Sequence, residues 1–148
     1  MKPLDVGAPA PPIPGVEFDG PVVLFFYKVT CPTCQMAAPV AERLATAHPG
    51  RLVGVVQDPP ERADAFAREY RTAFPFVTDT EPYGTSDAYG VRTVPTLFVV
   101  ENGAVTDVVE SWDRDGWNRV AASLGSATEV SANPVSTESD GLPPFRPG

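Results

Sequence analysis

The sequence predicts an α/β fold in which a central mixed β-sheet is flanked by helices. The unbroken apolar run Val22–Phe26 is typical of a buried strand, and a second such run, Leu52–Val56, follows a helical segment. A strand, a helix and a strand in this order form a right-handed crossover between parallel strands. Farther along, Asn102-Gly103 stands between two apolar runs and indicates an antiparallel hairpin. The predicted sheet therefore contains both kinds of pair.

The chain begins with a proline-rich segment. Prolines at positions 3, 9, 11, 12 and 14 leave no room for a helix, so we expect residues 1–19 to form an extended arm. After the first strand, Pro32 suits the first position of a helix that runs towards Ala47. Pro49-Gly50 then marks the end of this helix.

The second half of the predicted domain alternates helices with short strands. In order, we expect a helix opening at Asp58–Glu61, an extended segment Phe74–Asp79, a brief helix Ser86–Val91, hairpin strands Leu97–Val100 and Val105–Val109, and a last helix from Asp113 to Gly125. Apolar residues at helical spacing predict the buried stripes of the two longer helices. These stripes are Ala63, Phe66, Ala67, Tyr70 and Phe74 in one helix, and Trp117, Val120, Ala121 and Leu124 in the other.

The end of the chain differs in composition from the rest. Residues 126–148 are rich in Ser, Thr, Glu, Asp, Pro and Gly and poor in apolar side chains. Such a segment buries too little surface to offset the cost of ordering it, so we expect a disordered acidic tail. The chain then divides into an arm over residues 1–19, a single domain over residues 20–125 and a tail over residues 126–148.

Charge and composition exclude several classes of partner. The chain of 148 residues has a net charge of −8 and a pI of about 4.5, which argues against nucleic acid or an anionic membrane as partners. The first residues lack the apolar core of a signal peptide, and no apolar run is long enough to span a membrane. We therefore expect a cytoplasmic protein, in which paired cysteines are more often catalytic than structural.

The two cysteines carry the predicted chemistry. Cys31 stands at the strand-to-helix turn, and Cys34 follows after Pro32 and Thr33, on the same face of the helix. A helix N-terminus favours negative charge and hence the thiolate. In such motifs the thiol pKa falls from about 8.5 to about 3.5–7.5. We expect Cys31 to attack a substrate disulfide and Cys34 to resolve the mixed disulfide.

Two structural interpretations compete with this one. A structural zinc site needs four ligands, and only His48 remains as a further soft ligand, so we expect no metal site. An inert disulfide that closes so short a loop would stabilise the fold little. His48 itself, next to Pro49, is expected to be a surface or capping residue without a functional role.

Three features together resemble the thioredoxin-fold superfamily. They are the Cys31-Pro32-Thr33-Cys34 motif after a buried strand, Pro39 eight residues after Cys31, and Val94-Pro95-Thr96 before a strand. The resemblance covers roughly residues 20–125. The helix and strand inserted before Asp79 are similar to those of the TlpA and peroxiredoxin branches. The expected fold is thus a thioredoxin fold with an insertion of this kind.

The resemblance implies roles for the residues around the dithiol. A cis bond before Pro95 would turn this loop towards the cysteines, and the backbone of Val94 would bind a substrate segment as an added strand does. Thr30, Pro32 and Thr33 would complete the substrate groove. Lys28 occupies the position of a glutaredoxin lysine, where a cation would lower the thiol pKa or meet a glutathione carboxylate, whereas the alternative is a solvated loop lysine.

The sequence departs from the family pattern at two positions near the motif. Thioredoxins carry a buried carboxylate six residues before the first cysteine, where this chain has Phe25, so proton transfer at Cys34 must use water or another group. Thr30 replaces the usual tryptophan. Peroxiredoxins carry a threonine three residues before the reactive cysteine, where this chain has Lys28, so we do not expect peroxide reduction as the main activity.

The expected function is that of a thiol–disulfide oxidoreductase in cell redox homeostasis, more a reductant than an oxidant. Its substrates would be disulfide-containing proteins or glutathione-type molecules, and a reductase or a low-molecular-weight thiol would donate electrons. We expect a monomer without metal or organic cofactor. Two other hypotheses remain open: a thioredoxin-fold module that binds Cu(I) through two thiolates, and a non-catalytic adaptor.

Overall fold

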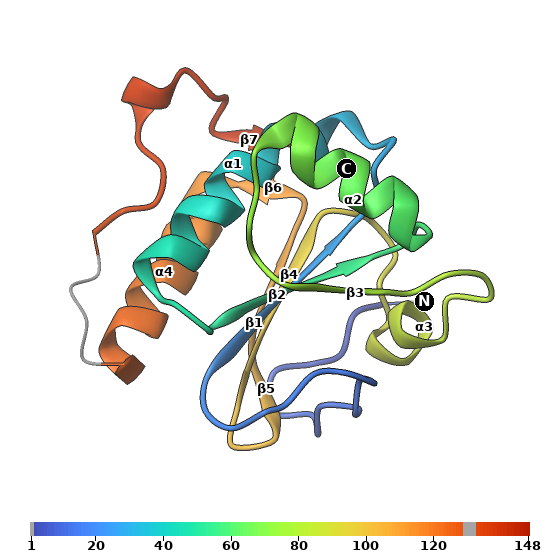
Figure 1. The fold of residues 1–148 in the computed structure, drawn as a ribbon. Helices are drawn as coiled ribbons and strands as arrows, with labels where there is room; N and C mark the ends of the chain where they lie inside the picture. Colours follow the sequence, from blue (N-terminus) through green and yellow to red (C-terminus); the bar gives the residue numbers. More distant parts are fainter. Residues whose placement is uncertain (1, 129–132) are drawn as a thin grey trace.

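A five-stranded mixed sheet forms the centre of the molecule (Figure 1). The structure is a computed structural model, and it describes residues 2–128 and 133–148. Its elements are β1 (Val22–Tyr27), α1 (Pro32–Ala47), β2 (Leu52–Val56), α2 (Pro60–Tyr70), β3 (Phe76–Thr78), α3 (Gly84–Tyr89), β4 (Thr96–Glu101), β5 (Ala104–Glu110), β6 (Trp112–Asp113), α4 (Arg114–Thr128), the 3-10 helix η1 (Glu138–Asp140) and β7 (Phe145–Arg146).

The order of the strands is β3-β2-β1-β4-β5, with β1 at the centre. β1 pairs with β2 and β2 with β3 in parallel, whereas β4 pairs antiparallel with both β1 and β5. The mixed α/β fold predicted from the apolar runs and the Asn-Gly turn is therefore confirmed. The carboxyl ends of the parallel strands β1 and β2 meet at one edge of the sheet, and the turn into α1 leaves from that edge.

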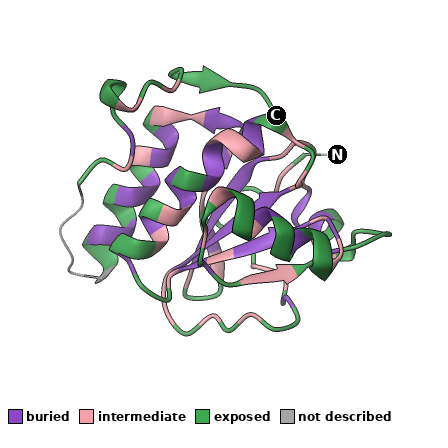
Figure 2. Ribbon diagram, turned by 45° about the horizontal axis from the view of Figure 1, so that its top comes forward, coloured by how far each residue is buried: buried purple, intermediate pink, exposed green. Residues whose placement is uncertain are grey.

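The side chains of β1 alternate between two hydrophobic cores, as successive residues of a strand must. Val23, Phe25 and Tyr27 face the core covered by α1, α2 and α4. The intervening side chains face the second core, which α3 and the N-terminal arm cover. Because β1 is buried on both sides, its sequence is continuously apolar rather than alternating (Figure 2).

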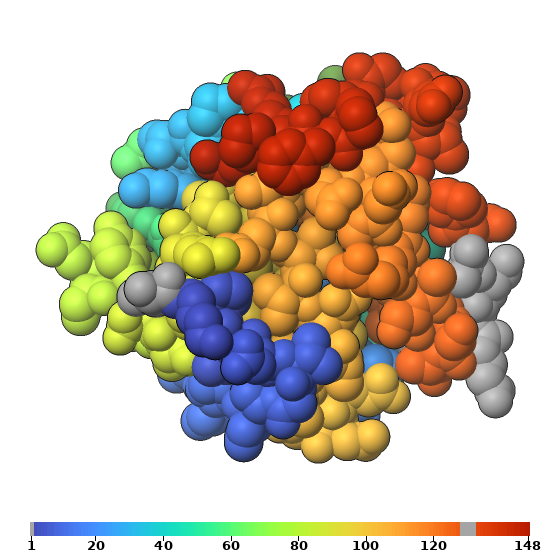
Figure 3. All heavy atoms as spheres, turned by 180° about the vertical axis from the view of Figure 1, so that it is seen from behind, coloured from blue at the N-terminus to red at the C-terminus, as the bar shows by residue number. Residues whose placement is uncertain are grey.

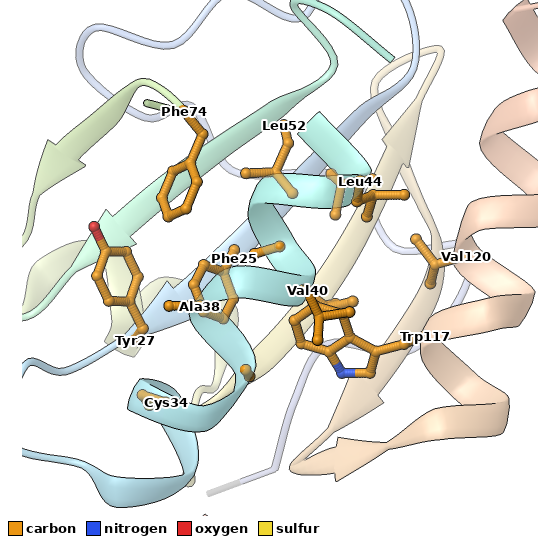
Figure 4. Close-up of a cluster of buried hydrophobic side chains, with 14 of the residues drawn as sticks. Phe25, Tyr27, Cys34, Ala38, Val40, Leu44, Leu52, Phe74, Trp117 and Val120 are labelled. Atoms are coloured by element: carbon orange, nitrogen blue, oxygen red, sulfur yellow. The ribbon is translucent and has the colours of Figure 1, made fainter. Parts of the chain in front are cut away.

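An aromatic cluster joins the sheet to the helices on the face of α1 (Figure 4). The ring of Phe25 stacks on Tyr27 with a centroid distance of 4.7 Å. Its edge contacts are with Phe74 at 5.9 Å and with Trp117 of α4 at 5.7 Å. The position where thioredoxins carry a buried carboxylate is thus filled by a ring that packs on three other rings.

The N-terminal arm lies extended beside β5. The amide of Gly7 donates to the carbonyl oxygen of Val105 at 2.7 Å, and the amide of Ala10 donates to that of Gly103 at 2.9 Å. Ile13 is buried in the second core. Among the described residues of the protein, no helix is both long enough and apolar enough to cross a membrane.

The prediction of a disordered tail over residues 126–148 is wrong for the part that the structure describes. Helix α4 continues past Gly125 to Thr128, residues 129–132 lie outside the described residues, and residues 133–148 pack against α1, β6 and α4. The composition predicted disorder because most of the contacts that hold this segment are hydrogen bonds to its backbone and to a few polar side chains, and only Val135 and Leu142 of its described residues make apolar contacts with the core. His48 is the C-terminal cap of α1, as one alternative had it, but it is buried.

Replacing Phe25 tests the aromatic cluster. We expect Phe25→Ala to reduce the free energy of unfolding by about 3–5 kcal/mol, because a buried ring is lost and a cavity remains. Val6→Ala is the matched control, since the Val6 side chain is 65% exposed and its truncation should change little. Urea denaturation followed by circular dichroism measures both, and equal losses in the two variants would contradict the packing described.

Candidate functional site

The two cysteines lie at the first turn of α1. Cys31 is the N-cap residue in extended conformation, and its sulfur accepts the amide N–H of Cys34 at a distance of 3.1 Å. Pro32 occupies the first turn, where a missing amide hydrogen costs no hydrogen bond. Both cysteines are free thiols. Cys31 is half-buried and Cys34 is fully buried, so only the first can meet a substrate directly.

The surroundings of Cys31 favour its thiolate. Its pKa is lowered to about 6, chiefly because the Cys34 thiol hydrogen-bonds to the sulfur and because the backbone amides of Cys34 and Thr33 point at it. Burial opposes this shift, and the positive charge of Arg146 adds to it. The amides at the N-terminus of α1 therefore stabilise the Cys31 thiolate, as the sequence predicts. At neutral pH, Cys31 is mostly thiolate.

Cys34 has the opposite character. Burial raises the pKa of its thiol far above the ordinary value, and the hydrogen bond to Cys31, the charge of Cys31 and the carboxylate of Asp58 raise it further. Only the backbone amide of Lys28 favours its thiolate. Cys34 thus holds its proton while Cys31 is a free thiolate. Two of these causes depend on Cys31 and disappear once that sulfur is covalently bound.

Asp58 is the functional candidate that the sequence did not identify. It follows β2 at the edge of the sheet where β1 ends, and it is 4% exposed. Its Oδ2 accepts the amide N–H of Val29 at 2.9 Å, while the adjacent amide, that of Lys28, points at Cys34. Arg62 lies 3.9 Å from its other carboxylate oxygen. A buried carboxylate is therefore present beside the resolving thiol, although it comes from β2 and not from β1.

The loop before β4 forms the other wall of the site. The Val94–Pro95 peptide bond is cis, and the carbonyl oxygen of Val94 lies 3.5 Å from the sulfur of Cys31. Pro95 is buried, and its carbonyl oxygen accepts the amide N–H of Ser111 at 2.7 Å. The hydroxyl of Thr96 donates to the carbonyl oxygen of Thr93 at 2.7 Å. This loop is therefore fixed against the dithiol.

The remaining predicted site residues lie close to the dithiol in different settings. Thr30 and Pro32 are exposed at the turn, whereas Thr33 is buried and donates its hydroxyl to the carbonyl oxygen of Pro147 at 2.6 Å. Lys28 acts on the thiols through its backbone amide, and the cation that lowers the pKa of Cys31 is Arg146. Pairing by the Lys28 side chain with substrate stays a prediction.

The described residues offer no ready metal centre. Among residues 2–128 and 133–148, no group of three or more His, Cys, Asp or Glu side chains is arranged to hold a metal ion. The Cu(I) alternative would therefore have to use the two sulfurs of Cys31 and Cys34 alone.

Comparison with known families places this dithiol in context. The model of the AhpC/TSA family matches residues 15–108, which is more than half of the chain and contains both cysteines and the cis-proline loop. The chain belongs to the AhpC/TSA family. The match ends within β5, so α4 and the C-terminal segment lie outside it.

The known proteins similar to this AhpC/TSA chain include a thioredoxin, dsbF and the thioredoxin domain of a thiol-disulfide oxidoreductase. The chain is 28% identical over 94 residues to Thioredoxin 1 of Nostoc sp., covering 64% of this chain and 69% of that one. It is 32% identical to dsbF of MTB. The structural match covers 71% of this chain and 81% of dsbF, with a TM-score of 0.62. It shares the fold of the thioredoxin domain of a thiol-disulfide oxidoreductase from Bacteroides vulgatus, with a TM-score of 0.70 and 19% identity. This match covers 82% of this chain and 99% of that domain.

These matches confirm the thioredoxin-fold superfamily for this AhpC/TSA chain, and they support a disulfide oxidoreductase activity at the level of the family. The alignments span about two thirds of the length of the curated thioredoxins, at 69%, 64% and 65%.

The pKa of Cys31 predicts how its reactivity depends on pH. Because only the thiolate reacts and the pKa is lowered to about 6, the rate of alkylation by iodoacetamide should rise through about pH 6 and be constant above about pH 7.5. Cys34 is buried and should not react in the folded protein. Stopped alkylation followed by mass spectrometry gives the profile. A midpoint above pH 8 would contradict the contacts described.

The negative charge of Asp58 predicts a change in the titration of the Cys34 thiol. Asp58→Asn keeps an oxygen for the amide of Val29 but removes the charge that raises the pKa of Cys34. In a Cys31→Ala background, we expect this change to shift the Cys34 thiol titration to lower pH, as read from thiolate absorbance at 240 nm. Asp64→Asn, at an exposed position on the same helix as Arg62, is the control and should leave the titration unchanged.

Proposed function

We propose that the chain reduces disulfide bonds in polypeptides by means of the Cys31–Cys34 dithiol. One observation carries this proposal: the half-buried Cys31 sulfur accepts a helix amide while the Cys34 thiol beside it is fully buried, and the pKa values of the two thiols are shifted in opposite directions. A reactive, half-buried thiolate next to a protected, protonated thiol is what a two-step exchange reaction needs.

In the first step, the thiolate of Cys31 attacks one sulfur of the substrate disulfide. A bond forms between Cys31 Sγ and that sulfur, the substrate S–S bond breaks, and the other substrate sulfur leaves as a thiolate that takes a proton from water. The amides of Cys34 and Thr33 that held the negative charge of Cys31 remain in place to orient its sulfur. Val94, whose carbonyl faces Cys31, would align the substrate backbone.

In the second step, Cys34 resolves the mixed disulfide. Once Cys31 is bonded to substrate it carries no charge, so two of the causes that raise the pKa of Cys34 are gone and its proton can leave to water. The resulting thiolate attacks Cys31 Sγ, the Cys31–Cys34 bond forms, the bond between Cys31 and the substrate breaks, and the second substrate sulfur leaves as a thiolate that takes a proton from water. The substrate has gained two electrons and two protons, whereas the dithiol has lost two electrons and the Cys34 proton, and solvent has supplied the second proton.

The direction of reaction is also part of the proposal. A pKa of about 6 for Cys31 lies near the value of about 7 for thioredoxin and well above about 3.5 for the strong oxidant DsbA. A reducing compartment such as the cytoplasm, with a reductase or a small thiol as electron donor, suits a dithiol of this kind.

Trapping tests the assignment of the two cysteines. Cys34→Ser should accumulate a mixed disulfide with a disulfide-containing polypeptide, because the resolving thiol is absent. The product is visible as a band in gel electrophoresis that a reducing agent removes. Cys31→Ser should form no such band and should lose insulin reduction by at least about 1000-fold, since the buried Cys34 cannot reach substrate.

The outcome that would contradict this proposal is mixed-disulfide formation through Cys34, or full activity in Cys31→Ser. A Cu(I) titration of the reduced protein with glutathione as competitor tests the copper alternative on the same samples. Tight binding of one Cu(I) together with no disulfide exchange would favour that alternative.

A further inference from the structure

The segment Leu142–Gly148 crosses the face of the molecule that carries the dithiol. At its start, the carbonyl oxygen of Leu142 accepts a hydrogen bond from the Arg114 side chain at 2.6 Å, and that of Pro143 accepts one from the indole N–H of Trp112 at 2.6 Å. The amide of Arg114 donates to the carbonyl oxygen of Pro144 at 3.0 Å. Residues 145–146 then pair antiparallel with β6.

The end of this segment reaches both walls of the site. Thr33, between the two cysteines, donates its hydroxyl to the carbonyl oxygen of Pro147 at 2.6 Å. Gly148 lies so close to the cis-proline loop that an added Cβ would collide with the carbonyl of Val94 and the side chain of Thr93. In Figure 3 the red C-terminal segment lies against the light-blue turn and the yellow loop.

The contacts recognise the main chain of the segment. The indole N–H of Trp112, the Arg114 side chain, the Arg114 amide and the Thr33 hydroxyl are fixed donors, and each meets a backbone carbonyl oxygen. Three of these four carbonyls belong to prolines, which keep the chain extended and have no amide hydrogen to leave unpaired. A row of donors of this kind suits any extended polypeptide that offers carbonyls at similar spacing.

Few buried apolar contacts hold residues 142–148 in place. From residue 143 to residue 148 every residue is exposed, and the Phe145 side chain is 56% exposed. Only Leu142 packs against the core. A segment with few buried apolar contacts opens more readily than the rest of the fold.

We propose that this surface is a docking groove for extended, proline-containing polypeptides and that residues 142–148 occupy it in cis, so that a polypeptide substrate must displace them. The inference rests on the proposed disulfide reductase function and adds a substrate class and an internal competitor. A small disulfide does not need the row of donors and reaches the half-buried Cys31 beside the segment.

Deletion of residues 142–148 tests the proposal. If the segment fills the groove about four-fifths of the time, its removal should raise the rate of insulin reduction about fivefold. The rate with hydroxyethyl disulfide should change less than twofold. Arg146→Gln is the charge control: it keeps the segment, and it should move the Cys31 alkylation midpoint to higher pH without the fivefold gain.

A full-length variant with residues 142–148 replaced by Gly and Ser serves if the deletion fails to fold, as judged by circular dichroism. Unchanged insulin reduction in a folded variant, or an equal gain with both disulfides, would overturn the docking proposal alone.

Binding provides a readout that does not depend on activity. A fluorescent peptide with the sequence of residues 142–148 should bind the deletion variant, as measured by anisotropy, and should bind the full chain at least about fivefold more weakly because the groove is occupied. A peptide of the same length made of Gly and Ser is the control, and it should bind more weakly because it lacks the prolines that keep the chain extended. Equal binding of both peptides, or no binding to the deletion variant, would refute the groove. A groove that binds the peptide while neither protein reduces any disulfide would refute the proposed function and leave the docking surface supported.

Discussion

The structure of the site depends on the placement of Cys31 as the N-cap of α1. That placement directs two helix amides and the Cys34 thiol at one sulfur, and it brings the same sulfur to 3.5 Å from the carbonyl oxygen of Val94. It exists because a strand buried on both faces ends at the edge of the sheet where the next helix must begin. The opposite pKa shifts of Cys31 and Cys34 then follow from one hydrogen bond and from the unequal depth of the two thiols.

The replacement of a buried carboxylate by Phe25 changes how this site relates to the core. Phe25 completes an aromatic cluster with Tyr27, Phe74 and Trp117, so the centre of the sheet gains apolar packing at the position where thioredoxins carry a buried carboxylate. Negative charge near the resolving thiol is not lost, because Asp58 approaches from the end of β2. Its contact with Arg62 and with the amide of Val29 keeps that carboxylate in place.

The parts of the site that are local in sequence could be predicted, and so could the cis-proline loop that the family resemblance implies, whereas the contacts of Asp58 and of the C-terminal segment could not. The motif Cys31–Cys34, the helix start at Pro32 and the two apolar runs are signals within a few residues, and the structure has the corresponding elements in place. In the sequence, Asp58 has the pattern of an acidic residue that precedes a helix. Its position near Cys34 results from the parallel pairing of β1 and β2, which the local sequence does not show. The C-terminal segment was predicted to be disordered because its composition is polar. It is ordered through backbone carbonyls that meet donors on Trp112, Arg114 and Thr33, and such contacts leave no compositional signal.

The reduction potential of the Cys31–Cys34 pair, measured by equilibration with glutathione, tests the central claim most directly. A nucleophile whose pKa is about one unit below that of thioredoxin stabilises the dithiol by roughly 1.4 kcal/mol, or about 30 mV for two electrons, which places the potential at about −240 mV. A value in that region supports a polypeptide disulfide reductase. A value near −120 mV, typical of a strong oxidant, would contradict the account, as would a pair that never equilibrates with glutathione.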